Sequence, residues 1–281
     1  MNLPVPTSLS PSRVASFTDC ALAFRFSAIE RLPEPPSPWT SKGTLVHRAL
    51  ERLFADVAPA DRDVDAGLHQ LDLAWVELAD TPDFADLDLD EAARHEMRDD
   101  AAALVRNYFR LEDPTTVNAI GMELKLEARL GSLRLRGVID RLDLDDDGGL
   151  VVTDFKTGKA PSVNFENRRL GGVQFYAFLC EQLFGQRPAR VQLLHLKEPV
   201  AITSVPTEQS VRGFRSRTGA IWSAVERACE AGDFRPRPSG LCDFCAFKAY
   251  CPAFGGDPEL ARLALAPATA LAAAAAAAAA G

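Results

Sequence analysis

The first 110 residues show the spacing of apolar positions that is typical of α-helices. Apolar residues recur every three or four positions from Val14 to Phe26. A second helix with one apolar stripe is predicted to open at Gly43. Residues 67–110 continue as two or three amphipathic helices, with a break near Thr81-Pro82. The N-terminal part of the chain is therefore predicted to be helical.

The hydrophobic period changes from helical spacing to strict alternation at residue 121. Short turns, Gly131-Ser132 and DDDGG, separate three alternating runs, which indicates an antiparallel meander of three strands: 122–130, 133–144 and 150–156. A helix, a strand and a long helix are predicted after them: 166–184, 191–197 and 208–231. The apolar stretch AITSVP is expected to lead into the last helix. The meander thus lies between N-terminal and C-terminal helices.

This order of elements predicts an α/β protein with one domain over residues 8–256. It would consist of an N-terminal helical part, a core of sheet and helix, and a C-terminal helix with a cysteine-rich block: 8–120, 121–205 and 206–256. A length of 281 residues is enough for one large domain with a sizeable core. Residues 257–281 are rich in alanine and are expected to be a disordered tail.

Composition is that of a soluble globular protein, with 47% hydrophobic and 25% charged residues. No apolar run is long enough to span a membrane, and the first residues lack the pattern of a signal peptide. We therefore expect a cytoplasmic protein without a membrane partner. Thiols stay reduced in the cytoplasm, so the 6 cysteines are better explained as metal ligands or buried apolar residues than as disulfides.

The formal net charge of −8 is unevenly distributed. Residues 55–100 hold 15 acidic and 3 basic residues, whereas residues 129–256 hold 14 acidic and 18 basic residues. The acidic segment is interpreted as a solvated helical face. A surface that binds nucleic acid is expected elsewhere on the molecule.

Two carboxylates and a lysine are predicted to meet at the end of the meander. Asp154 and Lys156 stand two positions apart at the end of the third strand, so their side chains share a face. The antiparallel neighbour brings Asp140 close to them. A surface salt bridge between the strands is the alternative explanation. Carboxylates in this arrangement also suit a divalent cation such as Mg²⁺, with the lysine beside the developing negative charge.

Three cysteines lie close together near the C-terminus, at Cys242, Cys245 and Cys251. Pro252 follows them, as is common beside iron–sulfur ligands. A metal site needs a fourth thiolate, and Cys20 is the best candidate. Cys180 and Cys229 are predicted to be buried in helices. Zinc sites more often use two local pairs, which favours an iron–sulfur centre over a zinc-stabilised regulatory module.

Five motifs in this order and spacing resemble the RecB-family exonucleases of the PD-(D/E)xK nuclease superfamily, especially stand-alone bacterial members with an iron–sulfur cluster. The resemblance covers about residues 8–256. Its motifs are LSPSRVxxFxxC ending at Cys20, GTLVHRALE at 43–51, GVIDRLD at 137–143, DFKTGK at 154–159 and LCDFCAFKAYCP at 241–252.

The resemblance implies a mixed sheet with helices on its sides, the restriction-endonuclease-like core of the superfamily. It implies a metal site formed by three side chains and one backbone carbonyl: His47, Asp140, Asp154 and Phe155. On its own, a helical histidine such as His47 would be interpreted as a surface or packed residue. Lys156 would be catalytic, and the four cysteines would hold a [4Fe–4S] cluster.

The resemblance also suggests residues that contact DNA. Relatives often carry a glutamine four residues before the tyrosine of a Tyr-Ala pair, and here Tyr176 has Gly172 at that position. Gln174 is nearby on the sequence. Arg168 and Arg169 are candidates for phosphate binding.

These observations lead us to expect a Mg²⁺- or Mn²⁺-dependent deoxyribonuclease, acting as an exonuclease on single-stranded DNA in repair or recombination. DNA is the expected partner, and a separate helicase or repair protein would supply any unwinding. One alternative is a non-catalytic iron–sulfur protein that binds DNA ends. Another, by analogy within the superfamily, is a nuclease of the CRISPR-adaptation type.

Overall fold

The computed structural model describes residues 2–160 and 166–261, except the side chains of 166–171. The chain forms two compact units: unit 1 contains residues 1–35, 131–133 and 216–281, and unit 2 contains residues 36–130 and 134–215. The prediction of one domain over residues 8–256 stays a prediction. Of the predicted disordered tail, residues 258–261 are helical and Ala261 is buried, and residues 262–281 lie outside the described part of the chain.

Unit 2 is built on a five-stranded mixed sheet in the order β1-β2-β3-β4-β5. The strands are β1 (Asn118–Leu130), β2 (Leu133–Leu144), β3 (Leu150–Lys156), β4 (Arg190–His195) and β5 (Val200–Ser204). The pairs β2–β3 and β4–β5 are antiparallel, whereas β3–β4 is parallel. The α/β fold class with a meander and a mixed sheet is therefore confirmed. The stretch AITSVP leads into the last helix as expected, and its first four residues belong to the edge strand β5, which the sequence did not predict.

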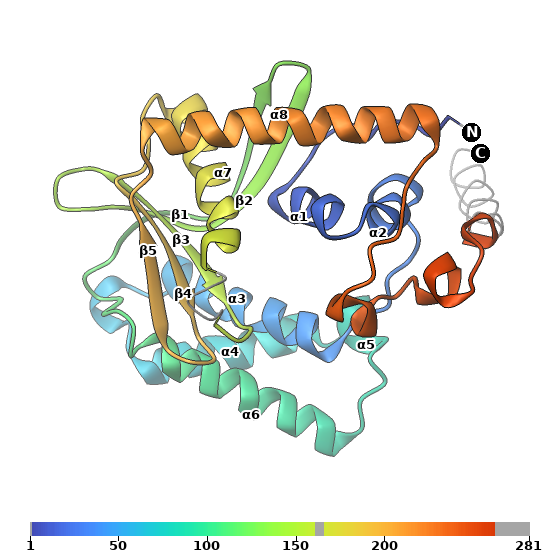
Figure 1. The fold of residues 1–281 in the computed structure, drawn as a ribbon. Helices are drawn as coiled ribbons and strands as arrows, with labels where there is room; N and C mark the ends of the chain where they lie inside the picture. The colour runs from blue at the N-terminus through green and yellow to red at the C-terminus, as the bar shows by residue number, and fades with distance from the viewer. Residues whose placement is uncertain (1, 161–165, 262–281) are drawn as a thin grey trace, which may run out of the picture. The chain divides into compact units, whose positions relative to one another are not determined.

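Unit 2 also contains helices. They are α3 (Pro38–Asp56), the short η2 (Pro59–Asp61), α4 (Val64–Leu78), α5 (Pro82–Ala85), α6 (Glu91–Tyr108) and α7 (Glu166–Phe184). Apolar residues of α3, α4 and α6 form one core with Phe155 and Leu194 of the sheet. Helix α7 contacts β1 and β4. Figure 1 draws α3, α4 and α6 together on one side of the sheet and α7 on the other.

Helix α3 begins five residues before the predicted start at Gly43. Ser37 is its N-cap, and the Ser37 hydroxyl accepts a hydrogen bond of 3.2 Å from the backbone N–H of Thr40. The Thr40 hydroxyl accepts one of 3.2 Å from the N–H of Ser37, which completes a capping box. Gly43 therefore lies inside the helix. A Cβ at this position would lie 3.2 Å from Thr157 Oγ1, so the close approach of Thr157 favours glycine there.

Unit 1 combines the chain's N-terminal and C-terminal segments. It holds α1 (Pro11–Asp19), α2 (Ala21–Phe24), the π-helix η1 (Arg25–Glu30) and the 3-10 turns η4 (Gly240–Phe244), η5 (Lys248–Tyr250) and η6 (Pro252–Phe254). The long helix α8 (Glu208–Ala231) ends in this unit. The predicted continuous helix from Val14 to Phe26 is broken at Cys20, whose backbone is extended. In residues 2–160 and 166–261, every helix is too short or too polar to span a lipid bilayer.

Candidate functional site

Three possible metal ligands meet in unit 2, each from a different element. They are His47 on α3, Glu123 on β1 and Asp140 on β2, and their ligand atoms all lie within 4.8 Å of one another. His47 Nδ1 lies 3.5 Å from Asp140 Oδ2 and 3.8 Å from Glu123 Oε1. Neighbouring oxygen or nitrogen ligands of an octahedral Mg²⁺ lie roughly 3 Å apart, and opposite ones roughly 4 Å. The donor set and its spacing therefore fit a small divalent cation.

The end of β3 completes this group. The backbone N–H of Phe155 donates a hydrogen bond of 2.6 Å to Asp140 Oδ2, and the Phe155 carbonyl oxygen lies 3.0 Å from His47 Nε2. The ammonium group of Lys156 is paired with the carboxylate of Asp154. The hydroxyl of Tyr176 on α7 donates a hydrogen bond of 3.4 Å to Asp154 Oδ1. The sheet thus brings the predicted carboxylates, carbonyl and lysine to one place.

The electrostatics of this place favour a cation. Burial and the nearby charge of Asp154 raise the pKa of Asp140 to about 7. Burial lowers the pKa of His47, but Glu123, Asp140 and Asp154 together outweigh it, so the pKa lies above its ordinary value. Burial and Asp154 also raise the pKa of Tyr176, which keeps its hydroxyl protonated as a donor. These carboxylates repel each other, and a divalent cation would relieve that repulsion.

Glu123 was missed by sequence reasoning. It lies in the alternating run MELKLEARL, where it resembles the solvent-facing Lys125 and Glu127. Its φ of 44° is in the left-handed region, which is unfavourable for residues other than glycine. Such strain is common at functional sites. Nothing in the sequence pattern predicts this backbone conformation.

The predicted DNA-binding residues differ in their positions relative to the site. Tyr176 is at the site, as described. Gln174 is half-buried on the same helix, and within the described part of the chain no hydrogen bond joins it to the carboxylates. A Cβ at Gly172 would meet no atom within 4 Å, so this position is open. The side chains of Arg168 and Arg169 lie outside the described residues.

A buried ion cluster lies behind the carboxylates. Arg141, with 0% exposure, pairs with Glu112 and with Asp143, to which its Nε donates a hydrogen bond of 2.8 Å. Its guanidinium also lies 5.7 Å from the ring centroid of Phe155. Paired groups on both sides satisfy a charge that would otherwise be costly to bury. The cluster therefore supports the ring of the residue whose backbone contacts both Asp140 and His47.

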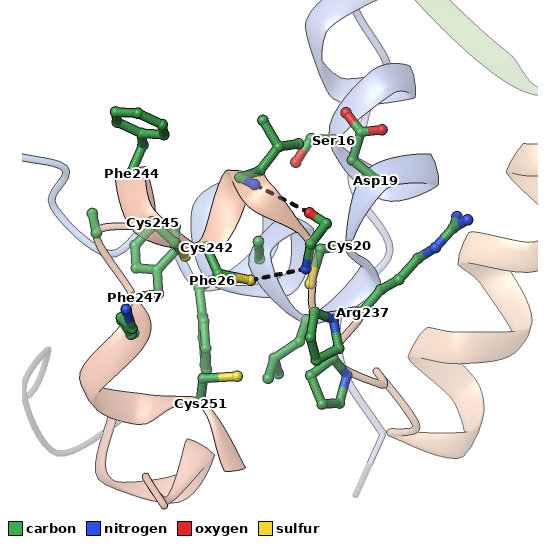
Figure 2. Close-up of a pocket in the computed structure, with 18 of the residues that line it drawn as sticks. Ser16, Asp19, Cys20, Phe26, Arg237, Cys242, Phe244, Cys245, Phe247 and Cys251 are labelled. Atoms are coloured by element: carbon green, nitrogen blue, oxygen red, sulfur yellow. Dashed lines mark hydrogen bonds between the residues drawn. The ribbon is translucent and has the colours of Figure 1, made fainter. Parts of the chain in front are cut away.

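The four predicted cysteine ligands line one cavity of about 250 Å³ in unit 1. Figure 2 shows the sulfur atoms of Cys20, Cys242 and Cys251 directed toward the same space. Burial and the charges of the other three cysteines raise the pKa of the Cys245 thiol. Aromatic residues close one side, where the ring of Phe26 lies 5.5 Å from that of Phe247. The structure thus places all four thiols around one space.

The remaining cysteines are fully buried, as the sequence predicted. Burial raises the pKa of Cys180 to about 12, so it stays an uncharged thiol. The thiol of Cys229 donates to the backbone carbonyl of Pro4 at 3.7 Å. Neither belongs to the residues that line the cavity.

A mixed sheet whose strands present carboxylates and a lysine at one site, with a histidine from a neighbouring helix, is the architecture of a metal-dependent nuclease. The sequence model of the PD-(D/E)XK nuclease superfamily matches residues 8–252, and the chain belongs to this superfamily. Members of this superfamily use divalent metals, and this chain has a His/Glu/Asp group that could hold one.

Two mycobacteriophage proteins are similar in sequence. The chain is 29% identical to the Gene 69 protein of Mycobacterium phage L5 over 136 residues, which are 47% of this chain and 44% of that protein. It is 24% identical to the Gene 69 protein of Mycobacterium phage D29 over 269 residues, 87% of this chain and 96% of that protein. The match thus spans less than half of the L5 protein. A solved structure of a candidate exonuclease from Eubacterium rectale has 13% identity and a TM-score of 0.46, and the match covers 85% of this chain and 87% of that one.

Proposed function

We propose that this nuclease is a Mg²⁺- or Mn²⁺-dependent exonuclease that hydrolyses single-stranded DNA from an end. The observation that carries the proposal is the convergence of His47, Glu123 and Asp140 on the end of β3, next to the Asp154–Lys156 pair. The rival hypothesis is a non-catalytic protein that binds DNA ends. It would be favoured by loss of a carboxylate or the lysine, and all of them are present.

The metal would be held by the predicted set with one addition. His47, Asp140, Asp154 and the carbonyl of Phe155 are the predicted ligands, and Glu123 adds a further carboxylate. When bound, Mg²⁺ or Mn²⁺ would polarise the scissile phosphate and lower the pKa of a water molecule.

The remaining groups would orient and stabilise the reacting atoms. The ammonium group of Lys156 is paired with Asp154. The positive charge of Lys156 would therefore lie beside the same phosphate, where negative charge develops. The neutral hydroxyl of Tyr176 fixes one oxygen of Asp154 and leaves the other toward Lys156. The N–H of Phe155 fixes Asp140 in the same way.

The biological role is proposed from the resemblance to RecB-family exonucleases. DNA repair or recombination is the setting that this resemblance favours, with a separate helicase or repair protein as partner. A cytoplasmic location agrees with the reduced thiols that the cysteine cavity requires.

The test is cleavage of end-labelled linear and circular single strands, with Mg²⁺ and with Mn²⁺. We expect the linear strand to be degraded and the circle to survive. Asp154→Ala and Lys156→Ala should each lower the rate by about 10²-fold or more. Lys125→Ala, an exposed lysine of β1, is the matched control and should cleave normally. Normal turnover by Asp154→Ala or Lys156→Ala would refute the assignment, and cleavage of the circle would refute the exonuclease.

We also propose that Cys20, Cys242, Cys245 and Cys251 hold a [4Fe–4S] cluster. All four cysteines line one cavity of about 250 Å³, which supports one group shared by them. Three ligands close together and a fourth far away in the sequence are less typical of zinc, which usually takes two local pairs. Anaerobically purified protein should be brown and contain iron and sulfide, and a colourless zinc protein would contradict the proposal.

A further inference from the structure

Trp39 is an exposed aromatic side chain outside the hydrophobic core. Its side chain is 67% exposed, although tryptophan usually buries most of its surface. It occupies the first turn of α3, where the cap at Ser37 and Pro38 at the first helical position fix the backbone. The ring is therefore presented to solvent from a rigid position.

Two lysines accompany the Trp39 ring. The ammonium nitrogen of Lys42 lies 5.1 Å from the ring centroid, and that of Lys197 lies 6.0 Å from it. Lys42 is only 13% exposed and is held by Asp100 at 2.6 Å, so it supports the ring. Lys197 is exposed and follows β4. A flat apolar face with ammonium groups beside it is complementary to a nucleotide, which has a flat base and a negative phosphate.

This group is adjacent to the strand end that carries the catalytic lysine. Trp39 and His47 lie eight residues apart on α3, which corresponds to roughly 12 Å along the helix. Between them, Gly43 approaches Thr157, the residue after Lys156. On the other side, the N–H of Leu196, next to Lys197, donates a hydrogen bond of 2.8 Å to the carbonyl of Lys156. Both α3 and β4 therefore connect the aromatic group to the reaction site.

We propose that Trp39, Lys42 and Lys197 form a subsite that stacks an unpaired base of the DNA strand, with Lys197 on a flanking phosphate. A paired base cannot offer its face to a side chain without leaving the duplex stack, so this subsite selects single strands. The inference rests on the proposed nuclease function and gives it a structural basis for substrate choice. Trp39 acts on substrate binding, away from the reacting atoms.

The test compares wild type, Trp39→Ala and Trp39→Phe on single-stranded oligodeoxythymidylate. Trp39→Ala should raise KM about tenfold with little change in kcat, and Trp39→Phe should keep most of the affinity, because one base–aromatic stack is lost or kept. Phe184→Ala, an exposed aromatic outside the subsite, is the matched control and should match wild type. Equal melting temperatures would exclude a folding defect.

A set of oligonucleotides with one abasic site moved along the strand locates the stacked base. Wild type should show a raised KM at one abasic position, and Trp39→Ala should show no such position. Lys197→Gln should lower the slope of log affinity against log salt by about 0.7. A wild-type KM and abasic profile in Trp39→Ala would overturn the subsite and leave the nuclease assignment intact.

A binding measurement without metal separates failure of the subsite from failure of catalysis. In EDTA, oligodeoxythymidylate should quench tryptophan emission of wild type, and Trp39→Phe should lose most of this quenching. If wild type cleaves no DNA, the nuclease proposal fails, while this quenching still decides the subsite. Equal quenching in both proteins would mean that the ring has another occupant, such as a protein, and would refute the inference.

Discussion

The carboxylate site of unit 2 and the cysteine cavity of unit 1 both collect ligands from distant parts of the chain, but the protein holds them differently. In unit 2 the ligands lie on long strands and a capped helix, and the N–H of Phe155 already fixes Asp140. In unit 1 three cysteines lie in or beside short 3-10 turns, and the fourth, Cys20, lies between helices α1 and α2. Regular structure thus organises the carboxylate site in advance, whereas the cysteine cavity should depend on the proposed cluster.

Hydrogen bonding of the ligands shows the same contrast. Asp140 and Asp154 accept hydrogen bonds of 2.6 and 3.4 Å from neighbours that belong to the fold. Cys242 accepts one of 3.3 Å from the N–H of Ser239 in its own turn, which adds no link to the rest of unit 1. A site with long-range support should keep its shape without metal. A site whose ligand is hydrogen-bonded only within its own turn should lose its shape when the proposed cluster is removed.

The largest effect is expected at the cysteines. Cys20→Ser should bleach the protein and lower its melting temperature strongly, because the proposed cluster closes a loop of more than 200 residues, worth about 5 kcal/mol in the cross-link model. Cys180→Ser and Cys229→Ser are the controls and should keep full iron with a modest loss of stability. Iron, sulfide and Tm are measured for each. Retention of a full cluster by Cys20→Ser would show that the fourth ligand is assigned wrongly.

A smaller loss is expected when the support of the carboxylate site is removed. Arg141→Met leaves the buried Asp143 and the half-buried Glu112 without their cation and should cost about 3–5 kcal/mol of unfolding free energy. Arg136→Met, on the same strand, breaks an exposed pair with Glu127 and should cost less than about 1 kcal/mol. Urea denaturation measures both. Equal losses would mean that the buried cluster gives the site no special support.

The stability of the metal-free site should depend on pH. The folded pKa of Asp140 is raised to about 7, and that of His47 is also raised. Both contribute stability at low pH that is lost as the pH rises through these values, so the metal-free Tm should fall between about pH 5 and pH 8. Since a metal needs the deprotonated ligands, Mn²⁺ should raise the Tm more at pH 8 than at pH 5.5. An equal shift at both values, or the same pH profile in Asp140→Asn, would contradict this.

The sequence was sufficient to predict the meander and the proximity of Asp140, Asp154 and Lys156. Alternation in β2 and β3 is a local signal, and the register between neighbouring antiparallel strands follows from their short turn. Asp140, Asp154 and Lys156 could therefore be brought together without knowledge of the remaining chain. The edge strand β5 was missed, since its residues are exposed or only half-buried and show little contrast between their two faces.

Features that depend on backbone distortion could not be predicted. The break of the first helix at Cys20 involves an extended residue in a helical pattern. Glu123 is similar, because its positive φ interrupts the alternation of β1 and residues 121–124 are all half-buried. Such conformations persist only where the surrounding structure holds them. Sequence periodicity carries no record of them.

The last prediction concerns two candidate metal ligands: Glu123, which sequence reasoning missed, and His47, which was expected from the family resemblance. His47→Ala and Glu123→Gln should each lower the cleavage rate by about tenfold, less than Asp154→Ala, because water can replace one ligand of a Mg²⁺ shell. Glu123→Gln keeps the shape of the side chain and removes its charge, so its defect should be smaller with Mn²⁺, which binds such sites more tightly than Mg²⁺.

Glu127→Gln is the matched control for this comparison, since Glu127 is an exposed carboxylate on the same strand. It should cleave at the wild-type rate with either metal. The measurement is the initial rate on end-labelled single strands over a range of metal concentrations, because a lost ligand raises the concentration needed for half-maximal rate. If Glu123→Gln behaves like Glu127→Gln, then the strained backbone at Glu123 serves the fold of β1 and the metal is held without it.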